Sequence, residues 1–332
     1  DSVTYSASGS EILIDNVSGV ITFSAAPDYE NKTTYSATVI ATDGNNSTEQ
    51  NITISISNLN DNSPVFTSST NLSIIENEIN VGTIVATDAD GDSISYTISG
   101  SELSITSDGV LTFISAPDYE TKSSYTATVT ATDGTNSSSQ DITVSVSNLN
   151  DNSPVFTSSA SFSAAENQTV IGTISASDAD GDAVIYSING ADAVSISINS
   201  SSGVLAFISA PDYETKTSYA LTATASDGVN SINQSITINI SDLNDNSPVF
   251  TSSATFSAAE NQTSIGTVTA TDADATDSIT FSISGTELSI TSAGVLTFAS
   301  APDYETTTSL SATVTATDGI NTTTQDVTVS VT

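Results

Sequence analysis

The sequence predicts an all-β chain made of tandem seven-stranded Greek-key β-sandwiches, arranged end to end as a rod. The first observation is a repeat, because Pro-Asp-Tyr-Glu begins at positions 27, 117, 211 and 302, in steps of 90, 94 and 91 residues. The second is strict alternation of apolar and polar residues within each repeat, which is typical of half-buried strands. A unit of about 90 residues has the size of one such sandwich.

The second repeat illustrates the expected strands. Residues 93–99, 125–133 and 141–149 alternate Ile, Val, Tyr or Ala with Ser and Thr, and a shorter apolar segment ends at Phe113. Clusters of Gly, Asn and Asp separate these segments, and no helical period is present. Tyr and Phe recur at the same positions of successive repeats, which indicates that they fill the sandwich cores.

The spacing of the motifs predicts four domains, at residues 1–61, 62–151, 152–245 and 246–332. Asp1 aligns with Asp92 of the following repeat, so the first domain is expected to lack its opening strand. Two explanations stay open. Either the chain is part of a longer array, or another molecule donates the missing strand.

Composition excludes several classes of function. The 332 residues include 39 acidic residues against 3 Lys, with no Arg, His or Cys and a net charge of −36. Such a chain offers neither the cationic surface that nucleic acids need nor a basic patch for anionic membranes. It contains no apolar run long enough for direct membrane insertion. The Ser- and Thr-rich, Cys-free composition indicates an extracellular cell-surface protein, with a bacterial source expected.

The acidic residues concentrate near predicted strand ends, in five motifs per repeat: Glu-Asn, Asp-Ala-Asp, Pro-Asp-Tyr-Glu, (Thr/Ser)-Asp-Gly and Leu-Asn-Asp-Asn. Turn preference explains a single Asp in a turn, but not Asp-x-Asp and Asp-x-Glu recurring in phase. Calcium takes about six to eight oxygen ligands from carboxylates, amide side chains and backbone carbonyls. The sequence therefore predicts calcium sites. The same pairs recur in every repeat, whereas a catalytic site is normally unique, so we expect no enzyme activity.

In this order and spacing the five motifs resemble cadherin repeats, and the resemblance covers essentially the whole chain. It implies cadherin-like, immunoglobulin-like sandwiches with about three Ca²⁺ ions at each complete junction. The ions would be bound by the repeat before the linker, the linker itself and the repeat after it.

Carried over residue by residue, the resemblance implies three sets of ligands. The first junction would use Asp28, Glu30, Asn60, Asp61, Asn62, Asp88, Asp90 and Asp133. The second would use Glu76, Asp118, Glu120, Asn148, Asn150, Asp151, Asn152, Asp178, Asp180 and Asp227. The third would use Glu166, Asp212, Glu214, Asp242, Asn244, Asp245, Asn246, Asp272, Asp274 and Asp318.

Three departures from the family pattern bear on these sites. The family linker often begins with Asp, but Asn58 and Asn148 stand there, and only Asp242 matches. We therefore expect the third linker to bind calcium more tightly than the first two. The first junction lacks the Glu of the Glu-Asn pair. In the fourth repeat Ala275-Thr276 replaces a single Gly, so that loop is expected to be rebuilt.

The predicted function is that of a structural stalk or filament segment of a cell-surface adhesin. Clustered carboxylates repel one another, so each linker is expected to be flexible without calcium and stiff with it. The expected partners are calcium and neighbouring repeats of a longer chain or fibre. Two alternatives stay open: an adhesive module that binds a glycan or a partner cadherin-like protein, and a fibre subunit that polymerises by strand donation.

Overall fold

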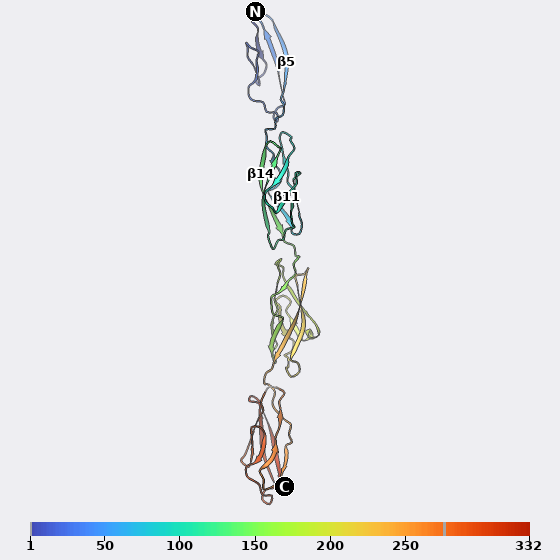
Figure 1. Ribbon diagram of the computed structural model, residues 1–332, viewed down its shortest axis with the longest axis vertical. Coiled ribbons are helices and arrows are strands. Elements are labelled where there is room, and N and C mark those ends of the chain that lie inside the picture. Colours follow the sequence, from blue (N-terminus) through green and yellow to red (C-terminus); the bar gives the residue numbers. More distant parts are fainter. Residues whose placement is uncertain (1, 275–276) are drawn as a thin grey trace. The chain divides into compact units, whose positions relative to one another are not determined.

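The computed structural model describes residues 2–274 and 277–332, and it confirms the predicted all-β fold of tandem sandwiches. The chain divides into two compact units, residues 1–150 and 151–332, and each unit holds two of the repeats (Figure 1). The loop expected to be rebuilt at Ala275-Thr276 lies outside the described residues.

The second repeat shows how one unit of the array is built. Its strands are β6 (Val65–Phe66), β7 (Asn71–Ile75), β8 (Asn80–Thr83), β9 (Ala86–Thr87), β10 (Ser95–Ile98), β11 (Leu103–Ile105), β12 (Val110–Phe113), β13 (Ser124–Thr132) and β14 (Ser137–Ser147). One sheet has the order β10-β13-β14-β7, and another has the order β11-β12-β8. β6 pairs with β9. All neighbours are antiparallel except β7, which runs parallel to β14.

Alternation along the strands puts one face of each sheet into the core. Val129 and Ala131 on β13 are fully buried, as are Val144 on β14 and Leu111 on β12 of the facing sheet. Thr130, which lies between Val129 and Ala131, points the other way, because successive side chains of a strand alternate between faces. The packing of these two faces is the main source of stability of the repeat.

This repeat has nine strands where seven were predicted, because two of the predicted strands are interrupted. The first changes sheets between β6 and β7. The second is divided into β8 and β9 by Ile84 and Val85, and the backbone N–H of Ile84 donates to the carbonyl of Gly109. Gly109 has φ of +87°, and a Cβ atom there would lie 2.3 Å from the Ile84 carbonyl oxygen. Only glycine fits this close approach.

The third and fourth repeats have the same architecture. The third contains β15 (Val155–Phe156), β16 (Ser161–Ala165), β17 (Val170–Thr173), β18 (Ala176–Ser177), β19 (Ile185–Asn189), the 3₁₀ turn η1 (Ala191–Ser195), β20 (Ile196–Ile198), β21 (Val204–Phe207), β22 (Ser218–Ser226) and β23 (Ser231–Ser241). The fourth contains β24 (Val249–Phe250), β25 (Thr255–Ala258), β26 (Ser264–Thr267), β27 (Ala270–Thr271), β28 (Thr280–Ile283), β29 (Leu288–Ile290), β30 (Val295–Phe298), β31 (Ser309–Thr317) and β32 (Thr322–Val331).

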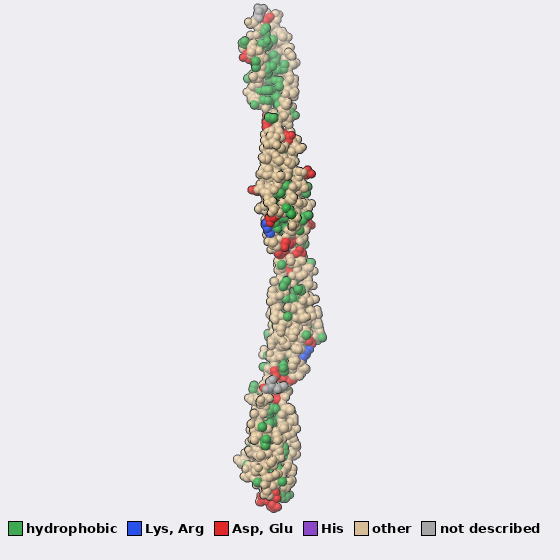
Figure 2. Space-filling view, in the orientation of Figure 1, with side chains coloured by type: hydrophobic (Ala, Val, Ile, Leu, Met, Phe, Trp, Pro, Cys, Tyr) green, Lys and Arg blue, Asp and Glu red, His purple; other side chains and the backbone are tan. Residues whose placement is uncertain are grey.

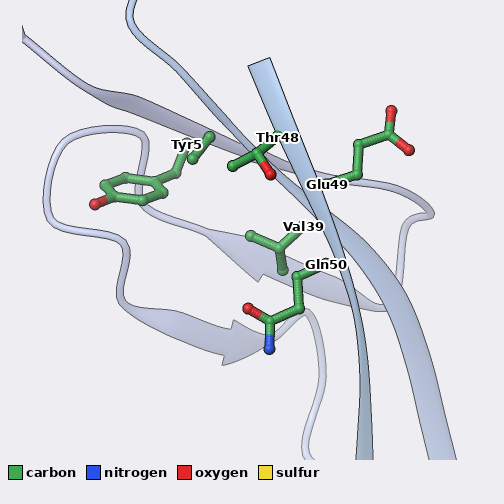
Figure 3. Close-up of a pocket in the computed structure, with 6 residues that line it drawn as sticks. Tyr5, Val39, Thr48, Glu49 and Gln50 are labelled. Carbon is green, nitrogen blue, oxygen red and sulfur yellow. The ribbon is translucent and has the colours of Figure 1, made fainter. Parts of the chain in front are cut away.

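The first repeat contains the equivalents of β10 to β14. They are β1 (Thr4–Ala7), β2 (Ile12–Ile14), β3 (Ile21–Phe23), β4 (Thr34–Thr42) and β5 (Ser47–Ser55). They form the sheets β1-β4-β5 and β2-β3, and among the described residues no strand pairs with the second edge of β5. Tyr5, Val39 and Thr48 line a cavity of about 310 Å³ on this repeat (Figure 3). Figure 2 shows hydrophobic side chains on the same repeat.

Within the described ranges, no helix has the length and hydropathy needed to span a membrane.

Candidate metal centre

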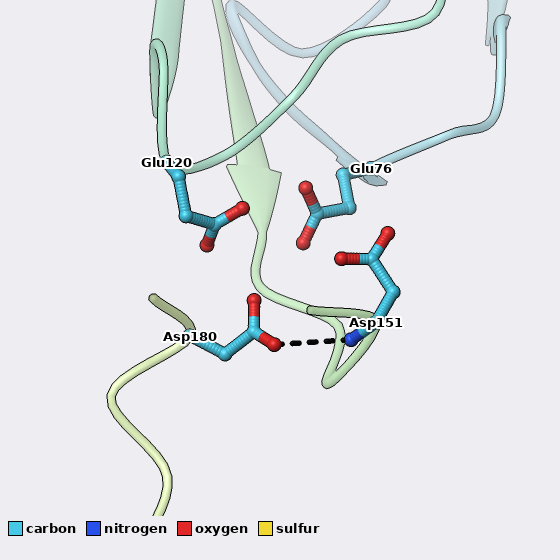
Figure 4. A group of neighbouring side chains, drawn as sticks. All are labelled: Glu76, Glu120, Asp151 and Asp180. Carbon is cyan, nitrogen blue, oxygen red and sulfur yellow. Dashed lines mark hydrogen bonds between the residues drawn. The ribbon is translucent and has the colours of Figure 1, made fainter. Parts of the chain in front are cut away.

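The second Asp of each Asp-Ala-Asp motif holds the linker that precedes its repeat. Asp90 Oδ2 accepts the backbone N–H groups of Asp61 and Asn62, at 3.1 and 2.8 Å. Figure 4 shows the equivalent bond in the second unit, where the Asp151 N–H donates to Asp180 Oδ2 at 3.1 Å. The linker is therefore folded around a carboxylate, so its backbone and amide oxygens are brought close to acidic side chains.

The Glu of the Glu-Asn pair is an internal anchor of its own repeat. Glu76 is only 2% exposed, and its two carboxylate oxygens accept the N–H groups of Tyr119 at 2.8 Å and Leu149 at 2.7 Å. The following Asn77 has a left-handed φ of 65°, which Asn tolerates better than most residues. This turn lets the Glu side chain point inward, where it ties the Pro-Asp-Tyr-Glu loop to the start of the linker.

The same arrangement recurs in the second unit. Glu166 is 1% exposed and accepts the N–H groups of Tyr213 at 2.8 Å and Leu243 at 2.7 Å. In the fourth repeat Glu260 accepts the Tyr304 N–H at 2.9 Å.

Two further predicted positions shape turns through hydrogen bonds to backbone N–H groups. Asp28, Asp118 and Asp212 begin the Pro-Asp-Tyr-Glu turns, where their Oδ1 atoms accept the N–H groups of residues two or three positions later. In the hairpin between β13 and β14, Asp133 Oδ1 accepts the N–H groups of Thr135 and Asn136 at 2.6 Å each. Asp227 and Asp318 bind their hairpins in the same way. The backbone bonds of these turns therefore use Oδ1. Oδ2 of Asp118 and of Asp212 accepts a Thr hydroxyl of the same turn.

The first predicted junction lies within the first unit, and three of its acids converge there. Carboxylate oxygens of Glu30, Asp61 and Asp90 lie within 4.8 Å of one another. Burial, together with the neighbouring carboxylate of Asp90, raises the pKa of Glu30. Burial acts in the same direction on Asp90, but hydrogen bonds from the side chain and backbone of Asn62 outweigh it and lower the pKa of Asp90.

The third predicted junction lies within the second unit. Carboxylate oxygens of Glu166, Glu214 and Asp245 lie within 4.8 Å of one another. Asp274, only 1% exposed, accepts the backbone and side-chain N–H groups of Asn246 at 2.8 and 2.9 Å. Burial and the charges of Glu166 and Asp274 raise the pKa of Glu214.

The second predicted junction divides between the two units, and each half has the local structure of its counterparts. In the first unit, Asp118 binds its turn and Glu76 anchors Leu149; Glu120 belongs to the same unit (Figure 4). The linker residues Asn148 and Asn150 are also in the first unit. In the second unit, Asn152 donates its backbone and side-chain N–H groups to Asp180, at 2.9 and 2.8 Å.

The first Asp of each Asp-Ala-Asp motif tests whether these residues fit a cation. Asp88 Oδ1 accepts the N–H of Asp90 at 3.0 Å, while its Oδ2 is buried and has no hydrogen-bond partner among the described residues. Asp178 and Asp272 have the same arrangement. A buried carboxylate oxygen without a partner is unfavourable, and a cation bound to it removes the deficit. The hard oxygen donors and these unpartnered atoms therefore fit calcium.

Three residues at these junctions were not predicted from the sequence. Asn136, Asn230 and Asn321 each lie three positions after the Asp of a (Thr/Ser)-Asp-Gly motif. Their side-chain amides donate to linker oxygens, for example from Asn136 Nδ2 to Asn60 Oδ1 at 2.7 Å. The recurrence of Asn at this position, which includes Asn46, was the signal that could have identified them.

The acidic side chains are grouped in bands, with mostly uncharged surface between them (Figure 2). This distribution agrees with the placement of the five motifs near strand ends.

No family model matches the chain. Among curated proteins it is 34% identical over 260 residues to human protocadherin Fat 4, which covers 71% of this chain and 5% of that protein. It is 34% identical over 291 residues to the human cadherin EGF LAG seven-pass G-type receptor 1, which covers 79% of this chain and 10% of that protein. The chain thus spans a small part of these relatives. These relatives are animal proteins and give no support to the expected bacterial source.

Solved structures give the same result. The protocadherin gammaB7 EC3-6 cis-dimer structure matches with a TM-score of 0.76 and 26% identity, covering 100% of this chain and 91% of that chain. Mouse cadherin-23 EC22-24 matches with a TM-score of 0.65 and 26% identity, covering 82% and 99%. The predicted extracellular location is confirmed. Relatives and solved structures together support the cadherin-repeat family for this chain, as a series of ectodomain repeats of the kind found in adhesion proteins.

Proposed function

We propose that the chain is a calcium-stiffened stalk segment of a cell-surface adhesion protein or extracellular filament. Calcium would bind at the inter-repeat linkers, with about three ions at each complete junction. Its ligands would be the residues that the cadherin resemblance implies for each junction. The relatives support the adhesive context. Cadherin repeats generally bind calcium at the junctions between repeats, which supports the calcium part of the proposal.

One observation carries this proposal. In the first unit the carboxylates of Glu30, Asp61 and Asp90 converge from the repeat before the linker, the linker itself and the repeat after it. Asp88, two residues before Asp90, contributes a buried oxygen with no partner among the described residues. Like charges at this separation repel one another, and a divalent cation turns the repulsion into attraction. Calcium would therefore join three segments that otherwise tend to separate.

The alternatives are less well supported. A strand donated by another molecule would pair with the second edge of β5, which has no paired strand among the described residues. A glycan- or partner-binding role would need a recognition surface, and the aromatic residues that such surfaces often use lie mostly in the cores here. Phe113 and Tyr125, for example, are 3% and 9% exposed.

Small-angle scattering of the whole chain tests the proposal. With calcium we expect a larger maximum dimension and a narrower distribution of conformations than with a chelator, because filled linkers resist bending. Magnesium, which demands a smaller octahedral site, is the control and should not replace calcium at equal concentration. Scattering curves that are identical with calcium and with chelator would refute the proposal.

A further inference from the structure

A side-chain amide reaches each linker from the β-hairpin of the repeat that follows it. In the first unit Asn136 Nδ2 donates to Asn60 Oδ1 at 2.7 Å and to the carbonyl of Asn62 at 2.9 Å. In the second unit Asn321 Nδ2 donates to Asn244 Oδ1 at 2.6 Å and to the carbonyl of Asn246 at 2.8 Å. Asn230 Nδ2 donates to the carbonyl of Asn152 at 3.0 Å. The contact therefore recurs at all three linkers.

The hairpin holds this amide in a fixed position. The backbone N–H of Asn321 donates to Asp318 Oδ1 at 2.6 Å, and its carbonyl accepts the Thr317 hydroxyl at 2.8 Å. Asn136 makes the equivalent bonds with Asp133 and Thr132. Because the backbone on both sides of the Asn is tied to its own turn, the side chain has little freedom to leave the linker.

The oxygens that the amide engages are the ones a cation at this junction would use. Asn60 Oδ1 and the Asn62 carbonyl are hard neutral donors on one loop, and the amide brings them to within hydrogen-bond distance of a single nitrogen. Each sp² oxygen has two lone pairs, so one oxygen can accept an N–H and still face a cation. The same contact can therefore persist whether or not calcium is bound.

We infer that Asn136, Asn230 and Asn321 are positioning residues, which fold each linker into its calcium-binding conformation before calcium arrives. A prearranged loop binds more tightly because less conformational freedom is lost on binding. This inference rests on the proposed calcium site, but the folding of the empty linker can be measured separately. The amide differs from the predicted calcium ligands, because it is neutral and donates hydrogen bonds whereas the ligands supply oxygens.

The test compares Asn321→Ala with Asn46→Ala in the whole chain. Asn46 holds the same kind of turn through Asp43 in the first repeat, and among the described residues its side chain donates to Asp43, at 3.4 Å. Asn46→Ala therefore removes the same side chain from a hairpin without removing a described linker contact. Hydrogen exchange with chelator present reports the empty linker, and calorimetric titration reports calcium binding.

We expect Asn321→Ala to speed amide exchange at residues 244–246 about tenfold in chelator, the order expected for losing neutral hydrogen bonds. We also expect it to weaken calcium binding at that junction about tenfold, while Asn46→Ala changes neither quantity. Thermal unfolding checks that both variants fold. If Asn321→Ala lowers the stability of its repeat, Asn136→Ala provides the same test on residues 60–62.

Three results would overturn the inference: equal effects of the two variants, unchanged exchange at residues 244–246, or tighter calcium binding by Asn321→Ala. The last result would mean that the amide competes with the cation. If the wild-type chain binds no calcium, the proposed function fails, while the exchange measurement still decides whether the amide orders the linker.

Discussion

The first and third linkers share a fold but differ at their first residue, and the difference changes their electrostatics. At the first linker Asn58 Nδ2 donates to the backbone carbonyl of Asp90 at 2.7 Å. At the third linker Asp242 stands in the same place, and it cannot donate. Its Oδ1 is buried and has no hydrogen-bond partner among the described residues.

The surroundings of Asp242 raise its pKa. Burial raises the pKa most, and the charges of Asp274, Glu166 and Asp277 raise it further. The first linker thus satisfies its first side chain internally, whereas the third holds a carboxylate that lacks a positive partner. We infer that the third linker depends more strongly on calcium and binds it more tightly.

The third linker is also anchored by the repeat that precedes it. Leu243, the second residue of the third linker, is held by Glu166. The third linker therefore combines a carboxylate that lacks a positive partner with a fixed starting point.

The largest effect is expected from removing this anchor. Glu166→Ala leaves the N–H groups of Tyr213 and Leu243 without their acceptor in a buried place, and a hydrogen bond to a charged group contributes about 1.5–3 kcal/mol. We expect the third repeat to lose about 3 kcal/mol of opening free energy, measured by hydrogen exchange in chelator. Glu287→Ala, which removes an exposed acidic side chain in the same unit, is the control. A loss of less than about 1 kcal/mol would show that the anchor matters little.

A smaller effect is expected from exchanging the first residues of the two linkers. Asp242→Asn should weaken calcium binding at the third junction about tenfold, and Asn58→Asp should strengthen it at the first by a similar factor, since each changes one carboxylate ligand. Calorimetric titration of the whole chain measures both. If the two substitutions shift affinity in the same direction, residue type at this position does not explain the difference between the linkers.

Much of the fold could be predicted from the sequence, because alternation and turn residues act locally. Val129 and Ala131 alternate with Thr along β13, and this pattern alone indicates a half-buried strand. The interruption between β8 and β9 could not be predicted, since it depends on contact between Ile84 and Gly109, far apart in the chain.

The candidate site was predictable in composition but not in its internal bonds. The convergence of acids agrees with the motif spacing, whereas the two bonds of Glu76 join it to residues 43 and 73 positions away. A pattern of residue types does not specify such partners. The different hydrogen bonding of Asn58 and Asp242 could not be predicted either, because it depends on where Asp90 and Asp274 lie beside the linkers.

We propose that calcium stiffens these linkers, the third at lower concentration than the first. The chain has no Cys, so paired spin labels can be introduced cleanly. Ser55→Cys with Ser145→Cys spans the first linker, and Asn239→Cys with Ser330→Cys spans the third; all four positions are exposed and equivalent between repeats.

Pulsed electron paramagnetic resonance measures the distribution of distances between the two spin labels across each linker. We would record it for both labelled chains during a calcium titration. We predict broad distributions in chelator that narrow on adding calcium, with the third linker narrowing first. Distributions that keep their width at every calcium concentration would show that calcium does not stiffen the linkers. Narrowing at the first linker before the third would show that the first linker binds calcium more tightly.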